Sequence, residues 1–461
     1  MQKKNLFVGL LLCSAFLFTG CKEIMSHLDN SVDSHLQVAD KVTVIGVGDT
    51  YTITKDVDYA TISDAAPKFE SQTPAIATVD PQTGAVKALK SGDARIKISL
   101  PDNGLYLDAS AVIDIKVRVK DTDGFIKNVE ALNPVDEILL AENATIDLTS
   151  KEIPSIIFNG DVAIKGVKGK PATIKAVPFI MKKKIAFENI YIDAAGLASK
   201  NLLTYSDEPD ESLNTGTAES PRYNIYGDAI KFENVVVDNI PRGIISDNGK
   251  CYIPENVIIS NSILHFVPAS GNQNAIHFNT NNNGIKNLKI EESTIYASGD
   301  NKLGYFVKYA NNARIDRFGY DSNKDKIEFH FNKNTFYGLC SNYFHNYGSA
   351  LKNYAIFDIT KNIFYYNNTN STQTKQIVQR IVGQASKSAG TELNFDGNAF
   401  LHNGTPYDCN QSENTNKQSY NVDTNSVSYD PGFTDPAQGN FKPTDVHFTS
   451  EEAPGDPRWR K

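Results

Sequence analysis

A seven-residue pattern of apolar and polar positions recurs along the second half of the chain. Its first position is Ile or Phe, and its sixth is Ile, Val, Leu or Phe. The pattern occurs at FENIYID (187–193), FENVVVD (232–238), ISNSILH (259–265), IEESTIY (290–296), FNKNTFY (331–337), ITKNIFY (359–365) and FDGNAFL (395–401). Because no long stretch shows an apolar period of 3.6 residues, we expect short strands and little helix.

The spacing of these copies indicates how the strands are arranged. Successive copies begin about 27 to 45 residues apart, which is too variable for a helical solenoid. A parallel β-helix explains the pattern, because equivalent positions of successive coils lie about 4.8 Å apart while the loops vary in length. A β-propeller would have more even units, and an antiparallel sandwich would need more hairpin turns. The sequence therefore favours a β-helix with positions one and six buried.

The fourth position of the pattern suggests a ladder of side-chain amides. In the last five copies it is Ser or Asn: Ser262, Ser293, Asn334, Asn362 and Asn398. We expect this position at the bend between two strands, where an amide can donate to one coil and accept from another. Stacked amides of this kind would satisfy backbone groups at a buried corner.

An earlier region has a different pattern. In SQTPAIATVDPQTGAVKALKSGDARIKIS (71–99), alternating segments are separated by the turns DPQTG and KSGD, which predicts two successive hairpins. The stretch from ATVD through TGAVKAL resembles the bacterial Ig-like group 2 family over residues 41–119. This resemblance implies a small antiparallel sandwich at residues 41–120, which serves as a spacer or adhesive unit without chemistry of its own.

The first residues read as a secretory leader. Two lysines precede an apolar stretch that is too short for a membrane span. The junction LFTGC resembles the lipobox of bacterial lipoproteins, which implies cleavage of a signal peptide (1–20) and acylation of Cys21. Several acyl chains anchor a protein stably. Residues 21–40 would then be a tether, and Lys22 implies retention in the outer membrane. We expect the protein at the cell surface, although these residues leave open which face of the membrane it occupies.

Composition narrows the set of partners. The formal charge of −8 argues against nucleic acid as a partner. Cys251, Cys340 and Cys409 match no zinc spacing, and their odd number leaves at least one unpaired within the chain. No acidic cluster recurs at one position of the pattern, so Ca²⁺ has no support, and we expect no metal and no cofactor.

Two resemblances concern the region after residue 125. DEILLAEN, IIFNGDVAIKGVKGKPATIKA and KIAFENIYID are similar to the start of pectate-lyase-like and chondroitinase-B-like right-handed β-helices. The tail YDPGFTDPAQGNFKPT with GDPRWRK resembles that of uncharacterised surface lipoproteins encoded beside polysaccharide-utilisation genes in gut bacteria. They imply an all-β chain, with a right-handed parallel β-helix and a C-terminal cap at residues 125–461 after the Ig-like sandwich. They do not fix an activity.

One candidate catalytic stretch is DNIPRGIISDNGKCYI (238–253). Lyases on this fold need a base near other cations and a positive group that neutralises a uronate carboxylate. Arg242 could bind the carboxylate and Lys250 could act as the base, with Asp247 between them. The alternative is that Arg242 belongs to a turn between coils and Lys250 is a solvated loop residue. No pair of neighbouring acidic residues suggests a glycosidase, so hydrolysis ranks below elimination.

One candidate binding surface is a row of aromatic residues. The seventh position should point outward, and in four successive copies it is His265, Tyr296, Tyr337 and Tyr365. Sugar rings can lie flat against such a stripe. The alternative is an aromatic ladder that stabilises the sheet or lies under a loop. His277, between Ile276 and Phe278, should also face outward, and we interpret it as structural.

The sequence leaves two functions open, both directed at an extracellular polysaccharide. The first is a non-catalytic glycan-binding or adhesive surface protein, which the aromatic stripe favours. The second is a lyase that cleaves a uronic-acid polymer by β-elimination, which would need a base beside a second cation. A purely structural surface protein is a further alternative.

Overall fold

The computed structural model describes most of the chain as two compact units. It describes residues 35–38, 42–53, 57–60, 66–101, 109–280, 283–310, 319–321, 325–341, 344–346, 355–367, 381, 391–406 and 423–460. The expected signal peptide, Cys21 and Cys409 lie outside these ranges. The second unit comprises the chain from Val117 onward together with the short segments Gly46–Gly48 and Leu89–Gly92. No helix in the described ranges is long and apolar enough to cross a membrane.

The first unit is a small β-sandwich. One sheet has the order β2 (Thr43–Gly46), β9 (Ala109–Arg118), β8 (Gly92–Leu100) and β5 (Lys68–Ser71). A second sheet has the order β3 (Thr50–Thr52), β7 (Ala85–Ala88) and β6 (Ala77–Val79). A third sheet pairs β1 (His35–Val38) with β4 (Val57–Ala60). Val86 and Ile96 are fully buried. The expected hairpin of β6 and β7 is present. The second hairpin was wrong: β7 and β8 lie in different sheets, because the turn between them carries the chain from one layer to the other.

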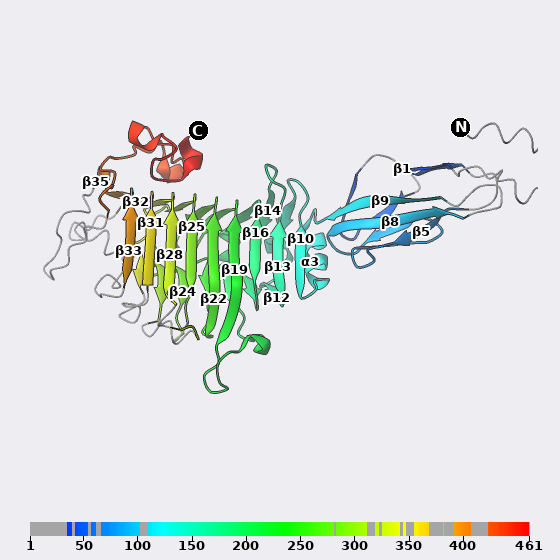
Figure 1. Cartoon of the computed structure of the whole chain (residues 1–461), viewed down its shortest axis with the longest axis horizontal. Helices are drawn as coiled ribbons and strands as arrows, with labels where there is room; N and C mark the ends of the chain where they lie inside the picture. Colours follow the sequence, from blue (N-terminus) through cyan, green and yellow to red (C-terminus); the bar gives the residue numbers. More distant parts are fainter. Residues whose placement is uncertain are drawn as a thin grey trace, which may run out of the picture. The chain divides into compact units, whose positions relative to one another are not determined.

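The second unit is a parallel β-helix with three long sheets (Figure 1). Sheet 1 contains β10 (Val135–Leu139), β13 (Asp161–Lys165), β16 (Ile185–Glu188), β19 (Tyr223–Glu233), β22 (Tyr252–Ser260), β25 (Asn287–Glu291), β28 (Ile327–Asn332), β31 (Ala355–Thr360) and β33 (Glu392–Asp396). Sheet 2 contains β11 (Thr145–Asp147), β14 (Ala172–Lys175), β17 (Ile190–Asp193), β20 (Val236–Ile240), β23 (Ile263–Phe266), β26 (Thr294–Ala297), β29 (Thr335–Tyr337), β32 (Ile363–Tyr366), β34 (Ala399–His402) and the antiparallel β35 (Thr405–Pro406). Sheet 3 contains β12 (Ile156–Phe158), β15 (Phe179–Met181), β18 (Leu203–Tyr205), β21 (Ile245–Ser246), β24 (Asn274–Phe278), β27 (Tyr305–Tyr309) and β30 (His345–Asn346).

Each copy of the seven-residue pattern joins the end of a sheet 1 strand to a sheet 2 strand. Its first positions pair in register from coil to coil, as Ile290 does with Phe331 and Phe331 with Ile359. Its sixth positions pair in the same way, as Ile295 does with Phe336. These side chains are buried in one shared interior. The prediction of an all-β chain, with an Ig-like sandwich before a parallel β-helix, is confirmed.

The expected amide ladder is present at the corner between sheets 1 and 2. Asn334 N–H donates to the side-chain oxygen of Asn362 (3.0 Å), and Asn362 N–H donates to that of Asn398 (2.9 Å). The Asn362 Nδ2 also donates to Phe331 O at 2.8 Å. The ladder ends at the buried Asp423, which accepts from the N–H and Nδ2 of Asn398 and from Gly397 N–H. The amides thus satisfy backbone groups that the turn would otherwise leave unpaired.

Two segments of the second unit lie outside its coils. A helix, α3 (Thr122–Glu130), precedes β10, and the Asp121 carboxylate caps it by accepting from Gly124 N–H. It buries Phe125 against the first coil. At the other end, residues 423–460 form the C-terminal segment, which lies beside sheet 2 of the later coils (Figure 1, red). It consists of turns and three short 3₁₀ helices, η9 (Pro436–Gln438), η10 (Val446–Phe448) and η11 (Pro457–Arg460).

Candidate functional site

The two candidate catalytic cations lie at different corners of one coil. Arg242 precedes β21 and Lys250 follows it, and both side chains are exposed. Arg242 Nη1 donates to Ser199 O at 2.8 Å. Asp247, between them, is buried, and its carboxylate accepts from Asn283 Nδ2 at 2.7 Å. The structure does not bring Arg242 and Lys250 together as base and clamp, and a catalytic role for either stays a prediction.

His277 lies on the outward face of sheet 3, as expected, but it is half-buried. Its neighbours in register are Ser246 on one side and Lys308 on the other. Burial lowers the pKa of His277, and the nearby Lys308 and Arg242 lower it further, against the opposing effect of Asp247. A neutral imidazole among cations was not anticipated from the sequence.

The aromatic stripe exists as a continuous file on the outer face of sheet 2. His265, Tyr296, Tyr337 and Tyr365 are neighbours in register on successive strands. The rings of His265 and Tyr296 stack with centroids 4.3 Å apart, and those of Tyr337 and Tyr365 are 4.8 Å apart. The file therefore follows the stack in the way the seventh position predicts.

The C-terminal segment packs on this stripe. Phe441 contacts the rings of Tyr296 and Tyr337 with centroids 5.0 and 5.4 Å apart, and Phe433 contacts Tyr337 and Tyr365. Tyr296 is only 8% exposed, and burial raises its pKa to about 12. The ring faces are therefore not an open platform in this structure. The alternative of a ladder under a covering segment describes this arrangement, and glycan binding by the stripe stays a prediction that requires the segment to move.

Hydrogen bonds fix the C-terminal segment to the threonines beneath it. Asp456 accepts from Thr294 Oγ1 at 2.7 Å, while its own N–H donates to Thr335 Oγ1. Trp459 Nε1 donates to Thr294 Oγ1 at 2.7 Å. Burial raises the pKa of Asp456, although Arg458, whose Nε lies 2.7 Å from the carboxylate, opposes this shift.

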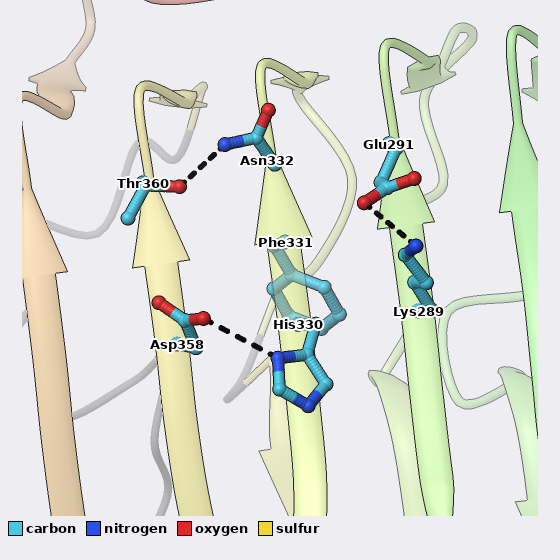
Figure 2. A pocket seen from close by; sticks show the side chains of 7 residues that line it. All are labelled: Lys289, Glu291, His330, Phe331, Asn332, Asp358 and Thr360. Atoms are coloured by element: carbon cyan, nitrogen blue, oxygen red, sulfur yellow. Dashed lines mark hydrogen bonds and ion pairs between the residues drawn. The ribbon is translucent and has the colours of Figure 1, made fainter.

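An open polar concavity lies on the outer face of sheet 1. We call it the sheet 1 pocket; it offers about 370 Å³ and is lined by Lys289, Glu291, His330, Phe331, Asn332, Asp358 and Thr360. The polar side chains come from three adjacent strands, β25, β28 and β31, and form two rows of three (Figure 2). One row is Lys289, His330 and Asp358, and the other is Glu291, Asn332 and Thr360.

Contacts within the sheet 1 pocket orient its polar groups. His330 lies between two carboxylates, with Nε2 2.7 Å from Glu328 and Nδ1 3.4 Å from Asp358. Lys289 pairs with Glu291 at 3.0 Å, and Asn332 Nδ2 donates to Thr360 Oγ1 at 2.6 Å (Figure 2). Donors and acceptors alternate across the floor, so a ligand that carries hydroxyl groups could bond to both kinds.

The described residues offer little for a metal ion or a reactive thiol. No group of three or more His, Cys, Asp or Glu within the described ranges could hold a metal ion. Cys251 and Cys340 are both buried. Burial raises the pKa of Cys251 to about 11, which is the opposite of what a nucleophilic cysteine needs.

Sequence reasoning missed the sheet 1 pocket. Its second row occupies position two of the pattern, and its first row occupies the position just before the pattern begins. These outward positions carry no apolar signal, so the repeat does not mark them. Comparing polar residues at position two of successive copies would have identified Glu291, Asn332 and Thr360 as neighbours.

Three family models match parts of the chain. A bacterial Ig-like domain (group 2) matches residues 34–104. A domain of unknown function (DUF4957) matches residues 145–298, and another (DUF5123) matches residues 329–459. No curated protein matches the chain. The expected Ig-like domain is thus found at the N-terminal end, while the two models that match parts of the β-helix describe domains whose function is unknown.

Proposed function

We propose that this chain is a surface protein that binds an extracellular polysaccharide through the sheet 1 pocket. The observation that carries the proposal is the double row of oriented polar side chains across three successive coils. A polymer of repeated hydroxyl-bearing units matches a surface that repeats along a stack. The proposal includes the lipid anchor at Cys21 and an outer-membrane location, both of which rest on the lipobox resemblance.

The test is retardation in gels that contain pectin, alginate or chondroitin sulfate. We expect the double variant H330A/D358A to bind at least about tenfold more weakly, because it removes the centre of one polar row, and a tenfold change corresponds to about 1.4 kcal/mol. The matched control is K231A/E233A. Lys231 and Glu233 form an ion pair on sheet 1 at the positions that Lys289 and Glu291 occupy two coils later, outside the pocket.

The outcomes separate the site from the function. If H330A/D358A is retarded as strongly as the wild type, the pocket is not the binding site. If no polysaccharide in a broad panel retards the wild-type chain, polysaccharide binding itself is wrong.

One observation favours a second function, the elimination of uronic acids. His277, on sheet 3, has a lowered pKa; its register neighbour is Lys308, and Arg242, in the turn before β21, is close enough to lower that pKa further. A neutral base would thus act beside two cations. The ultraviolet absorbance of unsaturated ends would appear with the wild type on a uronate polymer and be lost in H277A. Absence of this absorbance on every polymer would exclude elimination of those substrates.

A further inference from the structure

Three side chains from three successive coils form a hydrogen-bonded chain on the outer face of sheet 2. His265 Nδ1 lies 2.5 Å from Asp238 Oδ1, and His265 Nε2 lies 2.7 Å from Ser298 Oγ. A hydroxyl, an imidazole and a carboxylate in this order form the arrangement in which a base activates a serine and an acid orients the base.

The fold explains why these residues meet. Asp238 and His265 both occupy position seven, in successive copies of the pattern. Ser298 comes directly after β26 in the next coil, and its N–H donates to Phe266 O at 3.0 Å. Each coil therefore contributes one member, and the backbone ladder sets the separation between them.

Further contacts hold the acid and the base in place. Tyr191 Oη donates to Asp238 Oδ2 at 2.6 Å, and Asn239 N–H donates to Asp238 Oδ1. Burial alone would raise the pKa of Asp238, but the bonds from Tyr191 and His265 hold it below its usual value, so the group is a carboxylate. The imidazole of His265 is clamped by its parallel stacking on Tyr296.

The carboxylate also fixes the tautomer of the base. An ionised Asp238 can only accept, so His265 donates from Nδ1. In the neutral imidazole this leaves the Nε2 lone pair facing the Ser298 hydroxyl. That is the protonation state in which an imidazole can take the hydroxyl proton.

The serine has open space beside it. Gly299 follows Ser298 with φ +76°, and a side chain built there would meet nothing within 4 Å. Ser298 itself is half-buried, and the side chain of His265 is 15% exposed. Lys302 Nζ lies 3.4 Å from the carbonyl oxygen of Ala297, the residue before the serine, so a cation lies near this turn.

We propose that Ser298, His265 and Asp238 hydrolyse carboxylic esters, and that the natural substrates are O-acyl groups on the polysaccharide, a substrate class that rests on the proposed function. Ser298 Oγ attacks the acyl carbon while its proton passes to His265 Nε2. The bond from the acyl carbon to the sugar oxygen breaks, and that oxygen leaves with the proton from His265. Water then cleaves the acyl-serine ester, releasing the carboxylic acid and restoring the hydroxyl. The N–H of Gly299 is the expected donor to the oxyanion.

The test uses p-nitrophenyl acetate and a fluorophosphonate probe with the purified chain. We expect the wild type to release p-nitrophenol and to carry one fluorophosphonate on Ser298, located by peptide mass spectrometry. S298A should lose the adduct and at least about 10³-fold in rate. The control is S270A: Ser270 is exposed in a closely similar Ala-Ser-Gly turn one coil earlier, and its rate should match the wild type.

Asp238 is a positioning residue, so its test separates turnover from binding. D238N should lower kcat by orders of magnitude with little change in KM, because the amide can favour the wrong histidine tautomer. A labelled residue other than Ser298, or an S298A variant with the wild-type rate, would overturn the triad and leave it as a structural link between coils.

The small ester also separates this proposal from polysaccharide binding. Hydrolysis of p-nitrophenyl acetate needs no glycan, so it stands even if gel retardation fails. Release of acetate from an acetylated polysaccharide tests the substrate class. If the chain hydrolyses the small ester but releases no acetate from any acetylated polymer, the catalytic triad stands and the proposed polysaccharide substrate is wrong.

Discussion

At the scale of single residues, the amide ladder shows how a buried corner is kept without unsatisfied groups. Asn362 accepts at its side-chain oxygen from Asn334 N–H and Nδ2, and donates from Nδ2 to Phe331 O and to the side-chain oxygen of Asn398. In two preceding coils the ladder position is Ser262 and Ser293. Their hydroxyl oxygens also accept from a backbone N–H of the coil before, which is Val235 N–H for Ser262 and Ser262 N–H for Ser293. The serine side chain is shorter than that of asparagine. Each side chain therefore connects more than one coil.

Removing one amide of the ladder should lower the stability of the protein substantially. We expect Asn362→Ala to lower the free energy of unfolding by about 3 kcal/mol, because it leaves several buried donors and acceptors without partners and opens a small cavity. Urea denaturation followed by far-ultraviolet circular dichroism measures the change. Asn394→Ala, at an exposed position of β33, is the control and should cost about 0.5 kcal/mol or less. Equal effects would show that the ladder contributes nothing specific.

A second residue links stability to pH. His345 is fully buried among aromatic rings, with its ring centroid 4.5 Å from that of Phe329, and burial lowers its pKa to about 3. Below the unfolded-state pKa of about 6.5, the unfolded chain binds a proton that the folded chain does not. The contribution of a neutral His345 is therefore complete above about pH 6.5 and is lost as the pH falls towards the folded-state pKa.

We expect the wild type to lose about 1.4 kcal/mol per pH unit more than His345→Gln does over this range, since glutamine does not titrate. Chemical denaturation at several pH values measures both slopes. Parallel slopes would contradict the buried neutral histidine.

At the scale of elements, the sequence predicted the parts that repeat locally. Positions one and six of the pattern predicted the strands of sheets 1 and 2, because the same backbone geometry requires an inward apolar residue at these positions in every coil. Sheet 3 carries no comparable phrase: β21 (Ile245–Ser246) and β30 (His345–Asn346) have only two residues each, and the loops around them differ between coils. The helix α3 also escaped notice, because its nine residues are too short to establish a clear apolar period.

The candidate sites were harder to predict, for different reasons. The sheet 1 pocket joins outward residues of three coils, and no burial requirement constrains them. The link between Asp238 and His265 was in principle visible, since both occupy position seven in consecutive copies. The seventh position predicts His265 only as part of an aromatic file. Ser298 falls just outside the repeated phrase, so its place beside the imidazole required coordinates.

At the scale of the whole molecule, the C-terminal segment was beyond prediction from local patterns. Its contacts with Thr294 and Thr335 join residues that are 162 and 121 positions apart. The composition of GDPRWRK does not reveal that Asp456 is buried or that Trp459 reaches a threonine on sheet 2. This segment decides whether the aromatic stripe is covered, so the sequence alone could not settle the state of that surface.

The position of this segment can be followed through Trp459, because it is the single tryptophan of the chain. We expect Thr294→Val to shift its emission to longer wavelength and to release the segment at lower urea than the coils unfold, because Trp459 and Asp456 both lose a bond to Oγ1. Thr204→Val, on the outer face of sheet 3, is the control. Coincident fluorescence and circular dichroism transitions in Thr294→Val would show that the segment and the coils unfold as one unit.

A stack of identical rungs has no inherent length, because its last rung presents the same unsatisfied edge as every rung before it. Here the amide series reaches the side chain of Asp423, which receives hydrogens from Asn398 and Gly397 and, as a carboxylate, has none of its own to donate. Asp423 is thus a terminator as well as a partner. A second molecule that tried to continue the series end to end would meet a mismatched group, and this gives a modular fold a defined size.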